Sequence, residues 1–452
     1  MWTFIKRDDY PKYLETYPEL AEFPSDIILH ENEQFYFLPR WFIYNYPSRL
    51  LQTYEMPMKP SKFKNIETSI ELRDEQQPIV DTVLKVYKKY GNVHGIIKAR
   101  PGIGKTVIAI YLMVKLGFKT VILVDNDGLM EQWVERILQF TNLTEDNIGY
   151  FKARKVQLDK PVILSTVQTA MRRTEGSMYE TIQKINNAGV NFVIVDEVHT
   201  TSSSVKFAKS SLLFSTKNIL GLSATPYHVG LQKILMYNTV GPILYSTNEY
   251  ELLPKYYVLK YKSDIFSQKS AKRIFAINDF IARKSIYDKH LVKSESYIQT
   301  VVDVVKRLIK MEHVVMVLCR TIDQVKLISA ELEKAGIKNR RYYGQEREID
   351  KTEDKVLVVT YTFCGKGFDF PALSSLVLAT PLMGKKSLIQ TIGRILRKSD
   401  DKKNPIVVDL VDTDSLSIFP KMMQLKENVI KNEFGIEPEI IESVEEVGGD
   451  DE

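Results

Sequence analysis

The clearest chemistry in the sequence lies in a loop that ends in a lysine and a threonine. The loop is Ala99-Arg100-Pro101-Gly102-Ile103-Gly104-Lys105-Thr106. It stands between an apolar run ending at Ile97 and an apolar stretch of helical character over 107–116. Glycines let backbone N–H groups wrap around phosphate oxygens, and a helix N-terminus adds positive potential. The loop therefore predicts a nucleotide-phosphate site, with Lys105 on the β- and γ-phosphates and Thr106 on Mg²⁺.

The loop departs from the strict phosphate-binding pattern at one position. That pattern has glycine at its first position, where this chain has Ala99. A glycine-containing turn before a helix, with no ligand, is the alternative interpretation.

Two adjacent carboxylates follow another apolar run. Asp196 and Glu197 come directly after residues 192–195, Phe-Val-Ile-Val. The carboxyl ends of parallel strands face the crevice in which ligands bind. We therefore expect Asp196 to hold Mg²⁺ and Glu197 to orient or deprotonate the attacking water. A helix N-cap after a strand is the alternative, and His199 is interpreted as a packing or hydrogen-bonding residue. The loop and the acidic pair together predict a nucleoside triphosphatase.

The elements that must position these groups fall into two series of short apolar runs. The runs are 95–97, 121–124, 162–164 and 192–195, then 314–318, 356–359, 376–378 and 406–410. Short β-branched runs that alternate with helices are typical of strands buried on both faces of a parallel sheet. We therefore predict two doubly wound α/β domains. The polar segment 241–294 is expected to be an irregular connection between them.

The first 65 residues differ in composition from the rest of the chain. Fifteen of them are aromatic, against 10% for the whole sequence. We expect a small α+β domain followed by a linker near 55–64. Most of its rings should build a small core; the alternative is that they bind or wedge a nucleic-acid junction together with basic residues such as Arg40 and Arg49. The expected domains are therefore 1–65, 66–245, 246–432 with the connector included, and an acidic tail over 433–452.

Composition and charge exclude several classes of protein. With 44% apolar and 26% charged residues, the chain is not disordered over most of its 452 residues. Two cysteines, Cys319 and Cys364, exclude a disulfide scaffold and indicate a reducing compartment. No apolar run approaches the roughly 18 residues of a membrane helix, and the start does not resemble a signal peptide. We expect a cytoplasmic protein without membrane contact.

The net charge of +5 conceals an uneven distribution. From residue 432 onward there are nine acidic residues and no lysine or arginine. The rest of the chain is therefore basic, which favours a polyanionic partner. The acidic end is expected to be a disordered, solvated tail.

Five further motifs follow one another in a fixed order. They are Leu72-Arg73-Asp74-Glu75-Gln76, Thr166-Val167-Gln168, Ser223-Ala224-Thr225-Pro226, Thr360-Tyr361 with Gly367-Phe368-Asp369, and Gln390-Thr391-Ile392-Gly393-Arg394-Ile395-Leu396-Arg397. Each motif alone is weak, but the ordered set over about residues 70–412 resembles superfamily 2 helicases. The resemblance implies two tandem RecA-like domains, ATP and Mg²⁺ as ligands, and a nucleic-acid substrate.

The spelling of two motifs resembles one branch of that superfamily. DEAD-box RNA helicases have Asp-Glu-Ala-Asp and usually begin motif VI with histidine, whereas this chain has Asp-Glu-Val-His and Gln390. It is more similar to the DNA-acting group that contains XPB-like helicases and phage branch-migration helicases of the UvsW type, T5-like phages among their sources. A phage origin would place the protein in the host cytoplasm.

The resemblance also implies roles for the matching residues. Gln76 would read the adenine edge, Arg394 would contact the γ-phosphate, and Arg397 would be the arginine finger supplied by the second domain. Gly367 and Asp369 would couple the nucleotide to the nucleic acid. Contacts with the nucleic acid would come from Thr166, Gln168, Arg320 and Thr360. A solvated basic helix end is the alternative for the two arginines, and Ser223 and Thr225 are assigned no chemistry.

One departure concerns motif Ia. The chain has Asp125 and Asp127 near the expected phosphate track, where carboxylates repel phosphate. Either these side chains point away, or backbone N–H groups make the contact.

We therefore predict an ATP-dependent DNA helicase or translocase that unwinds or branch-migrates branched DNA, such as four-way junctions and forks. An RNA helicase, or an ATP-gated nucleic-acid clamp that does not unwind, remains open as an alternative. The sequence indicates no particular protein partner.

Overall fold

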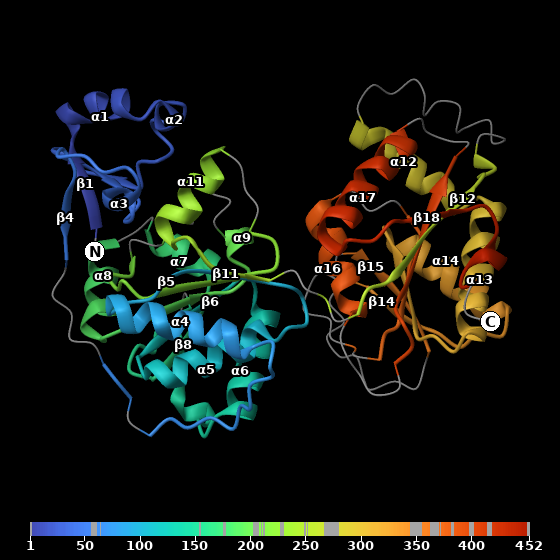
Figure 1. Cartoon of the computed structure of the whole chain (residues 1–452), viewed down its shortest axis with the longest axis horizontal. Helices are drawn as coiled ribbons and strands as arrows, with labels where there is room; N and C mark the ends of the chain where they lie inside the picture. Colours follow the sequence, from blue (N-terminus) through green and yellow to red (C-terminus); the bar gives the residue numbers. More distant parts are fainter. Residues whose placement is uncertain are drawn as a thin grey trace. The chain divides into compact units, whose positions relative to one another are not determined.

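The computed structural model shows two compact units, Met1–Thr247 and Asn248–Glu452, and each is described by itself (Figure 1). The structure describes residues 2–55, 61–63, 65–152, 155–174, 178–201, 208, 210, 213–226, 230–247, 250, 252–265, 280–343, 355–361, 370, 372–380, 384–396, 402–413 and 418–449. Within these ranges every helix is too short or too polar to traverse a bilayer.

A parallel sheet of seven strands forms the centre of the first unit, in the order β11-β5-β10-β9-β6-β8-β7. The strands are β5 (His94–Ala99), β6 (Thr120–Val124), β7 (Ile148–Tyr150), β8 (Val162–Thr166), β9 (Phe192–Val195), β10 (Ile219–Ser223) and β11 (Ile243–Thr247). All four apolar runs expected here are strands. Their side chains are buried on both faces, which is why the runs are continuously apolar.

Helices cover both faces of this sheet. One buried cluster joins the sheet to α4 (Gln77–Tyr90), α5 (Lys105–Leu116) and α6 (Asp127–Phe140). A second cluster joins it to α7 (Val167–Thr174), α8 (Met178–Asn187) and α11 (Gly230–Thr239). The domain is therefore doubly wound, as predicted.

The second unit contains another parallel seven-stranded sheet, in the order β14-β15-β13-β16-β17-β12-β18. Its strands are β12 (Lys255–Tyr261), β13 (Val315–Cys319), β14 (Arg340–Tyr342), β15 (Val356–Thr360), β16 (Ser375–Leu378), β17 (Ile406–Asp412) and β18 (Glu439–Ile441). Its helices are α12 (Phe280–Leu291), α13 (Glu295–Lys310), α14 (Ile322–Lys334), α16 (Lys385–Ile395) and α17 (Ile418–Phe434). Cys319 is buried in β13 as a free thiol, whereas Cys364 lies outside the described residues.

A small antiparallel sheet, in the order β2-β3-β1-β4, begins the chain. It is formed by β1 (Trp2–Lys6), β2 (His30–Glu31), β3 (Phe35–Leu38) and β4 (Gln52–Tyr54), with α1 (Tyr10–Thr16), α2 (Pro18–Ala21) and α3 (Phe42–Asn45). Ile5 and Leu38 from the sheet pack with Tyr13 and Phe42 from the helices. The predicted fold class, two doubly wound domains with a small α+β element before them, is confirmed.

A buried arginine fixes this small sheet to the rest of the first unit. The guanidinium of Arg40 is 1% exposed and donates to the carbonyls of Thr216 (2.5 Å) and Phe214 (2.9 Å). Burial lowers its pKa to about 10. The indole of Trp41 stacks on His94 with 4.0 Å between ring centroids. The alternative in which Arg40 contacts a nucleic-acid junction is therefore wrong, because its guanidinium is buried and hydrogen-bonded to backbone carbonyls inside the first unit.

Two sequence expectations differ from the structure. The segment 241–294 is not an irregular connection, because it contains β11 of the first sheet, β12 of the second and helix α12. The acidic end is not a disordered tail either: β18 pairs with β12, and Ile441 and Val447 are buried. The expectation of a tail rested on the number of acidic residues alone and overlooked the apolar residues between them. Burial of these apolar residues holds the end of the chain against the sheet.

Candidate active site

The phosphate-binding loop lies between β5 and α5, as predicted. Gly102 and Gly104 have φ angles of 85° and 89°, a region that favours glycine. A Cβ on Gly104 would lie 2.6 Å from Gln76 Nε2. Ala99, where the strict pattern has glycine, is fully buried at the end of β5. The loop therefore needs glycine at the two later positions and tolerates a methyl group at the first.

The side chain of Lys105 bends back over its own loop. Its ammonium donates to the carbonyls of Ala99 (3.0 Å) and Arg100 (3.3 Å). Both acceptors belong to the loop that would surround the phosphates. The charge of Lys105 is thus held at the place where phosphate oxygens are expected to bind.

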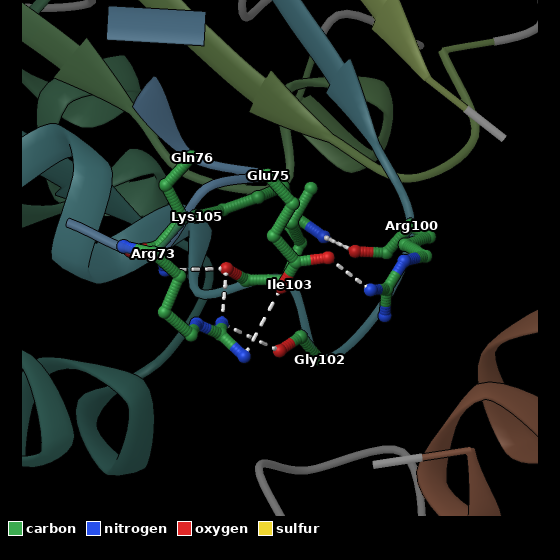
Figure 2. Close-up of polar contacts among 7 residues, drawn as sticks. All are labelled: Arg73, Glu75, Gln76, Arg100, Gly102, Ile103 and Lys105. Atoms are coloured by element: carbon green, nitrogen blue, oxygen red, sulfur yellow. Dashed lines mark hydrogen bonds and ion pairs between the residues drawn. The ribbon is translucent and has the colours of Figure 1, made fainter. Parts of the chain in front are cut away.

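A polar network from the preceding segment also contacts the loop (Figure 2). Arg73 donates to the carbonyl of Ile103 (2.6 Å), and the amide of Gln76 donates to the same oxygen (2.7 Å). Glu75 forms ion pairs with Arg73 (3.1 Å) and with the buried guanidinium of Arg100. Four side chains thus restrain the loop through its carbonyl oxygens and through the guanidinium of Arg100.

This network changes the interpretation of Gln76 and Arg100. Gln76 is 3% exposed, and its amide oxygen accepts from the backbone N–H of Arg73 (3.0 Å) while its nitrogen binds the loop. Readout of adenine by Gln76, which the resemblance implied, requires both of these bonds to be exchanged. Arg100 is 6% exposed and paired with Glu75, so its guanidinium supports the loop.

Asp196 directly follows β9 at its carboxyl end. In parallel α/β sheets, ligands bind outside the carboxyl ends of the strands. It is 8% exposed, and its carboxylate accepts from the indole N–H of Trp133 (2.8 Å) and from the backbone N–H of Glu197 (2.9 Å). Burial raises the pKa of Asp196, while the Trp133 bond and the Lys105 charge act against that rise. The carboxylate is therefore pre-oriented by two donors.

Trp133 belongs to motif Ia, but the sequence analysis assigned no role in the site to its indole. Among the residues that the structure describes, Trp133 is the largest fully buried side chain, and it lies on α6, the helix that follows β6. The sequence does show that residue 133 is a tryptophan, and a buried indole N–H requires a hydrogen-bond acceptor. The identity of that acceptor, 63 residues further along the chain, is not visible in the sequence.

Glu197 is aimed by its backbone and by a neighbouring histidine. Its φ of 45° is unusual for a residue with a side chain and stores strain that marks functional positions. Its carboxylate lies 3.1 Å from His199 Nδ1, which is also 2.6 Å from the hydroxyl of Ser223. Nδ1 is hydrogen-bonded to the Ser223 hydroxyl, whereas its approach to Glu197 is a close polar contact without hydrogen-bond geometry. His199 is a hydrogen-bonding residue, as expected, and Ser223 links the end of β10 to the acidic pair.

Thr106 and Asp196 provide donors that suit Mg²⁺. A hydroxyl and a carboxylate are hard oxygen ligands, and Mg²⁺ at a nucleotide keeps most of its remaining positions for phosphate and water. Among the described residues, no cluster of three or more His, Cys, Asp or Glu side chains forms a metal cage. The residues present therefore fit a magnesium ion that arrives with a nucleotide.

The second unit carries several of the residues implied by the resemblance. Arg394 lies on α16 and is partly buried. Arg320 follows β13, and its guanidinium binds the buried carboxylate of Asp288 (2.9 Å). Thr360, at the end of β15, is only 3% exposed, which does not suit the direct nucleic-acid contact expected of its side chain. Arg397, Gly367 and Asp369 lie outside the described residues.

The remaining expected nucleic-acid contacts lie at the end of β8. Thr166 ends this strand, and its hydroxyl accepts from the backbone N–H of Thr169 (3.2 Å) at the start of α7. Gln168 is exposed on the same turn. In motif Ia, Asp127 binds Lys152 (2.8 Å), so one of the two acidic side chains is already neutralised.

Fold and site together define a P-loop nucleoside triphosphatase with two RecA-like domains. Residues 69–228 match the family model described as type III restriction enzyme, res subunit. Residues 297–399 match the helicase conserved C-terminal domain. The chain is an ATP-dependent helicase of superfamily 2 that uses Mg²⁺ and acts on nucleic acid.

Relatives of the chain have names of more than one kind. It is 25% identical over 408 residues to a protein of Acanthamoeba polyphaga mimivirus named as an ATP-dependent RNA helicase, covering 85% of this chain and 71% of that one. It is 26% identical over 356 residues to the DNA 3'-5' helicase XPB of Mycobacterium tuberculosis, covering 76% and 61%. It is 23% identical over 357 residues to a protein of Escherichia phage T5 named as a helicase, covering 75% and 71%.

Solved structures agree on the architecture. The helicase domain of Pyrococcus furiosus Hef superposes with a TM-score of 0.52 at 16% identity, covering 79% of this chain and 99% of that one. At this identity the likeness shows the fold alone.

Proposed function

We propose that the substrate is DNA, and that the protein unwinds or branch-migrates branched DNA such as forks and four-way junctions. The observation that carries the choice of DNA is the match of residues 69–228, which contain the phosphate loop and the acidic pair, to the restriction-enzyme res subunit model. Restriction enzymes act on DNA, and the mycobacterial relative is named as a DNA helicase. The proposal of branched DNA, as in UvsW-type phage helicases, rests on the motif resemblance.

The same proposal assigns a role to each site residue. Lys105 binds the β- and γ-phosphates, and Thr106 and Asp196 hold Mg²⁺, which neutralises charge on the phosphate oxygens when bound. Glu197 orients the attacking water and takes its proton, because its carboxylate is aimed by His199. Arg394 and Arg397 are proposed to stabilise the charge that develops on the γ-phosphate.

His199 and Ser223 extend this assignment. Ser223 Oγ accepts from the backbone N–H of Thr225 (3.0 Å) and lies against His199, which lies against Glu197. A shift of the segment after β10 is therefore passed to the carboxylate that positions water. We propose that this chain of contacts couples hydrolysis to movement, a role that the sequence did not assign to Ser223.

An RNA helicase is the second candidate function. The observation that favours it is the mimivirus relative, which is named as an RNA helicase and aligns with 85% of this chain. The two candidates share the same motor, because phosphate contacts carry affinity without reading the sugar, and the 2′-hydroxyl alone distinguishes the two polymers at a given site.

A pair of measurements tests the proposal. ATP hydrolysis is measured with single-stranded DNA, duplex DNA, a four-way DNA junction and single-stranded RNA as stimulants. Dissociation of the labelled junction is then followed on a native gel with ATP and Mg²⁺. We expect the junction to stimulate turnover most and to be resolved only when ATP is present.

The controls separate the possible outcomes. Lys105→Ala should bind the junction without resolving it, and Lys115→Ala, an exposed lysine on the same helix, should behave as wild type. Stronger stimulation by RNA than by any DNA would refute the DNA assignment. ATP-dependent junction affinity without resolution would indicate a clamp.

A further inference from the structure

One face of the N-terminal sheet carries two groups of aromatic rings, Phe4 with Phe35, Phe37 and His30, and Trp2 with Tyr54. The strand pairs Phe4↔Phe37, Lys6↔Phe35 and Trp2↔Tyr54 place these side chains on the same face. His30 pairs with Phe37, and Gln52 pairs with Phe4, which adds them to that face. We call this the aromatic face; its members are Trp2, Phe4, Lys6, His30, Phe35, Phe37, Gln52 and Tyr54.

The rings of the aromatic face contact one another. The centroid of Phe4 lies 5.2 Å from that of Phe35 and 5.8 Å from that of Phe37, and His30 lies 5.5 Å from Phe37. Phe4, Phe35 and Phe37 belong to none of the hydrophobic clusters formed by the described residues. The opposite face of the sheet, with Ile5 and Leu38, supplies the core of the small domain instead. The aromatic face is therefore not needed to build that core.

Charge is sorted between the two sides of this small domain. Residues 1–55 contain nine acidic and five basic side chains. None of the nine lies on the aromatic face, since Glu31, the acidic residue within a strand, pairs with Tyr36 on the opposite face. The aromatic face carries Lys6 and His30, both exposed. A polyanion that is repelled by the domain as a whole is thus tolerated on this one surface.

We propose that the aromatic face binds single-stranded DNA by stacking its bases on Phe4, Phe35 and Phe37. The inference rests on the proposed function, because unwinding produces unpaired bases next to the motor. Every base has a π-face, so stacking on aromatic rings is tolerant of sequence. Lys6 and His30 sit among the rings at positions that can meet the phosphates between stacked bases. In duplex DNA the base faces are already stacked on one another, so they are not available to stack on these rings.

The attachment of the sheet gives this binding a consequence. Arg40 and Trp41 follow β3 directly and fix it to the first unit. A strand held on the aromatic face is therefore held at a constant place relative to the phosphate loop of the same unit. The aromatic face therefore binds the DNA strand at a fixed position in the first unit. A flexibly tethered domain would not fix the position of the bound strand.

The test compares the full-length protein with a ring-removing variant. Phe4→Leu/Phe37→Leu keeps apolar bulk on the sheet but removes two stacking surfaces. Tyr44→Leu is the matched control, because Tyr44 is a 63% exposed ring on α3, away from the sheet. Binding of labelled oligo-dT of about 16 nucleotides is measured by fluorescence anisotropy. Circular dichroism of each variant confirms the fold.

We expect the double variant to lose at least about fivefold in affinity, because each stacked base contributes about 5- to 150-fold. Stacking releases no counterions, so the loss should be similar at about 50 and about 200 mM salt. Photocrosslinking of an oligonucleotide with 5-iodo-deoxyuridine should label peptides that contain residues 2–6 or 35–38. Tyr44→Leu should bind oligo-dT as wild type does, and binding of a fully duplex DNA should be the same for wild type and the double variant.

Three results would overturn the inference. These are equal affinity of the double variant and wild type, crosslinks confined to the rest of the chain, and tighter binding of oligo-rU than of oligo-dT to the aromatic face. Failure of the proposed function is recognised separately, by ATP turnover that no DNA stimulates. A variant with normal DNA-stimulated turnover and weaker oligo-dT binding supports both.

Discussion

The bond between Trp133 and Asp196 makes a prediction that can be worked out in detail. Trp133→Phe keeps an aromatic ring in the buried position and removes the one N–H that the ring donates to the carboxylate. A hydrogen bond to a charged group contributes about 1.5–3 kcal/mol. Asp196 then retains the backbone N–H of Glu197, at 2.9 Å, as a donor. The carboxylate should become less well oriented for Mg²⁺.

The expected size of the effect follows from that energy. Each 1.4 kcal/mol corresponds to a tenfold change in an equilibrium constant, so the Mg²⁺ concentration for half-maximal hydrolysis should rise about ten- to hundredfold. Loss of the donor also removes a factor that lowers the pKa of Asp196, which burial already raises. The pKa therefore moves further up, and the acid limb of the activity profile should shift to higher pH.

The assay is ATP hydrolysis against Mg²⁺ concentration at saturating ATP, for wild type and two variants. Trp41→Phe is the matched control, because Trp41 is a 4% exposed indole in the same unit that stacks on His94 away from the acidic pair. Both substitutions leave a small cavity and cost about 1–2 kcal/mol of stability. If Trp133→Phe shows the same Mg²⁺ dependence as Trp41→Phe, the assigned role of the indole is refuted.

Three further predictions concern the loop and the buried arginine. Lys105→Ala should abolish hydrolysis while the thermal unfolding midpoint stays unchanged; normal turnover would show that the phosphates bind elsewhere. Gly104→Ala should lose ATP binding because its φ is 89° and its Cβ would lie 2.6 Å from Gln76 Nε2, whereas Gly117→Ala, with a φ of 66° at the end of α5, should cost stability and keep ATP binding. Equal ATP binding by both glycine variants would contradict this. Arg40→Ala should lower the free energy of unfolding of the first unit by about 2–4 kcal/mol in urea, because two buried carbonyls lose their donor. The exposed Arg49→Ala is its control, and equal midpoints for the two would contradict the anchoring role of Arg40.

Sequence patterns predicted eight of the strands whose side chains are buried on both faces, but they missed the interior strands β10 and β12. Continuous β-branched runs such as 192–195 indicate such strands, because their short length and β-branched residues distinguish them from an apolar helix such as α5. The edge strands were missed for the opposite reason. β14 reads Arg-Arg-Tyr and β18 reads Glu-Ile-Ile, and pairing on one side lets polar residues enter.

The site was predictable as far as residue type and local spacing determine it. The phosphate loop and the acidic pair are each contiguous, so their chemistry is visible in a short window. The supports are not contiguous: Glu75 meets Arg100 and Trp133 meets Asp196 only because the sheet brings them together. The same reason explains Gln76, whose amide binds a loop 27 residues away.

The pairing of β12 with both β17 and β18 determines when the second unit can finish folding during synthesis. β12 is the first strand of that sheet to leave the ribosome, yet its partners Val408 and Ile440 are near the end of the chain. When synthesis has reached only β16, β12 has been made but its two neighbours in the sheet, β17 and β18, have not. Unpaired apolar strands of this kind are prone to aggregate. A stop codon before residue 439 should therefore yield an insoluble product rather than a shortened enzyme.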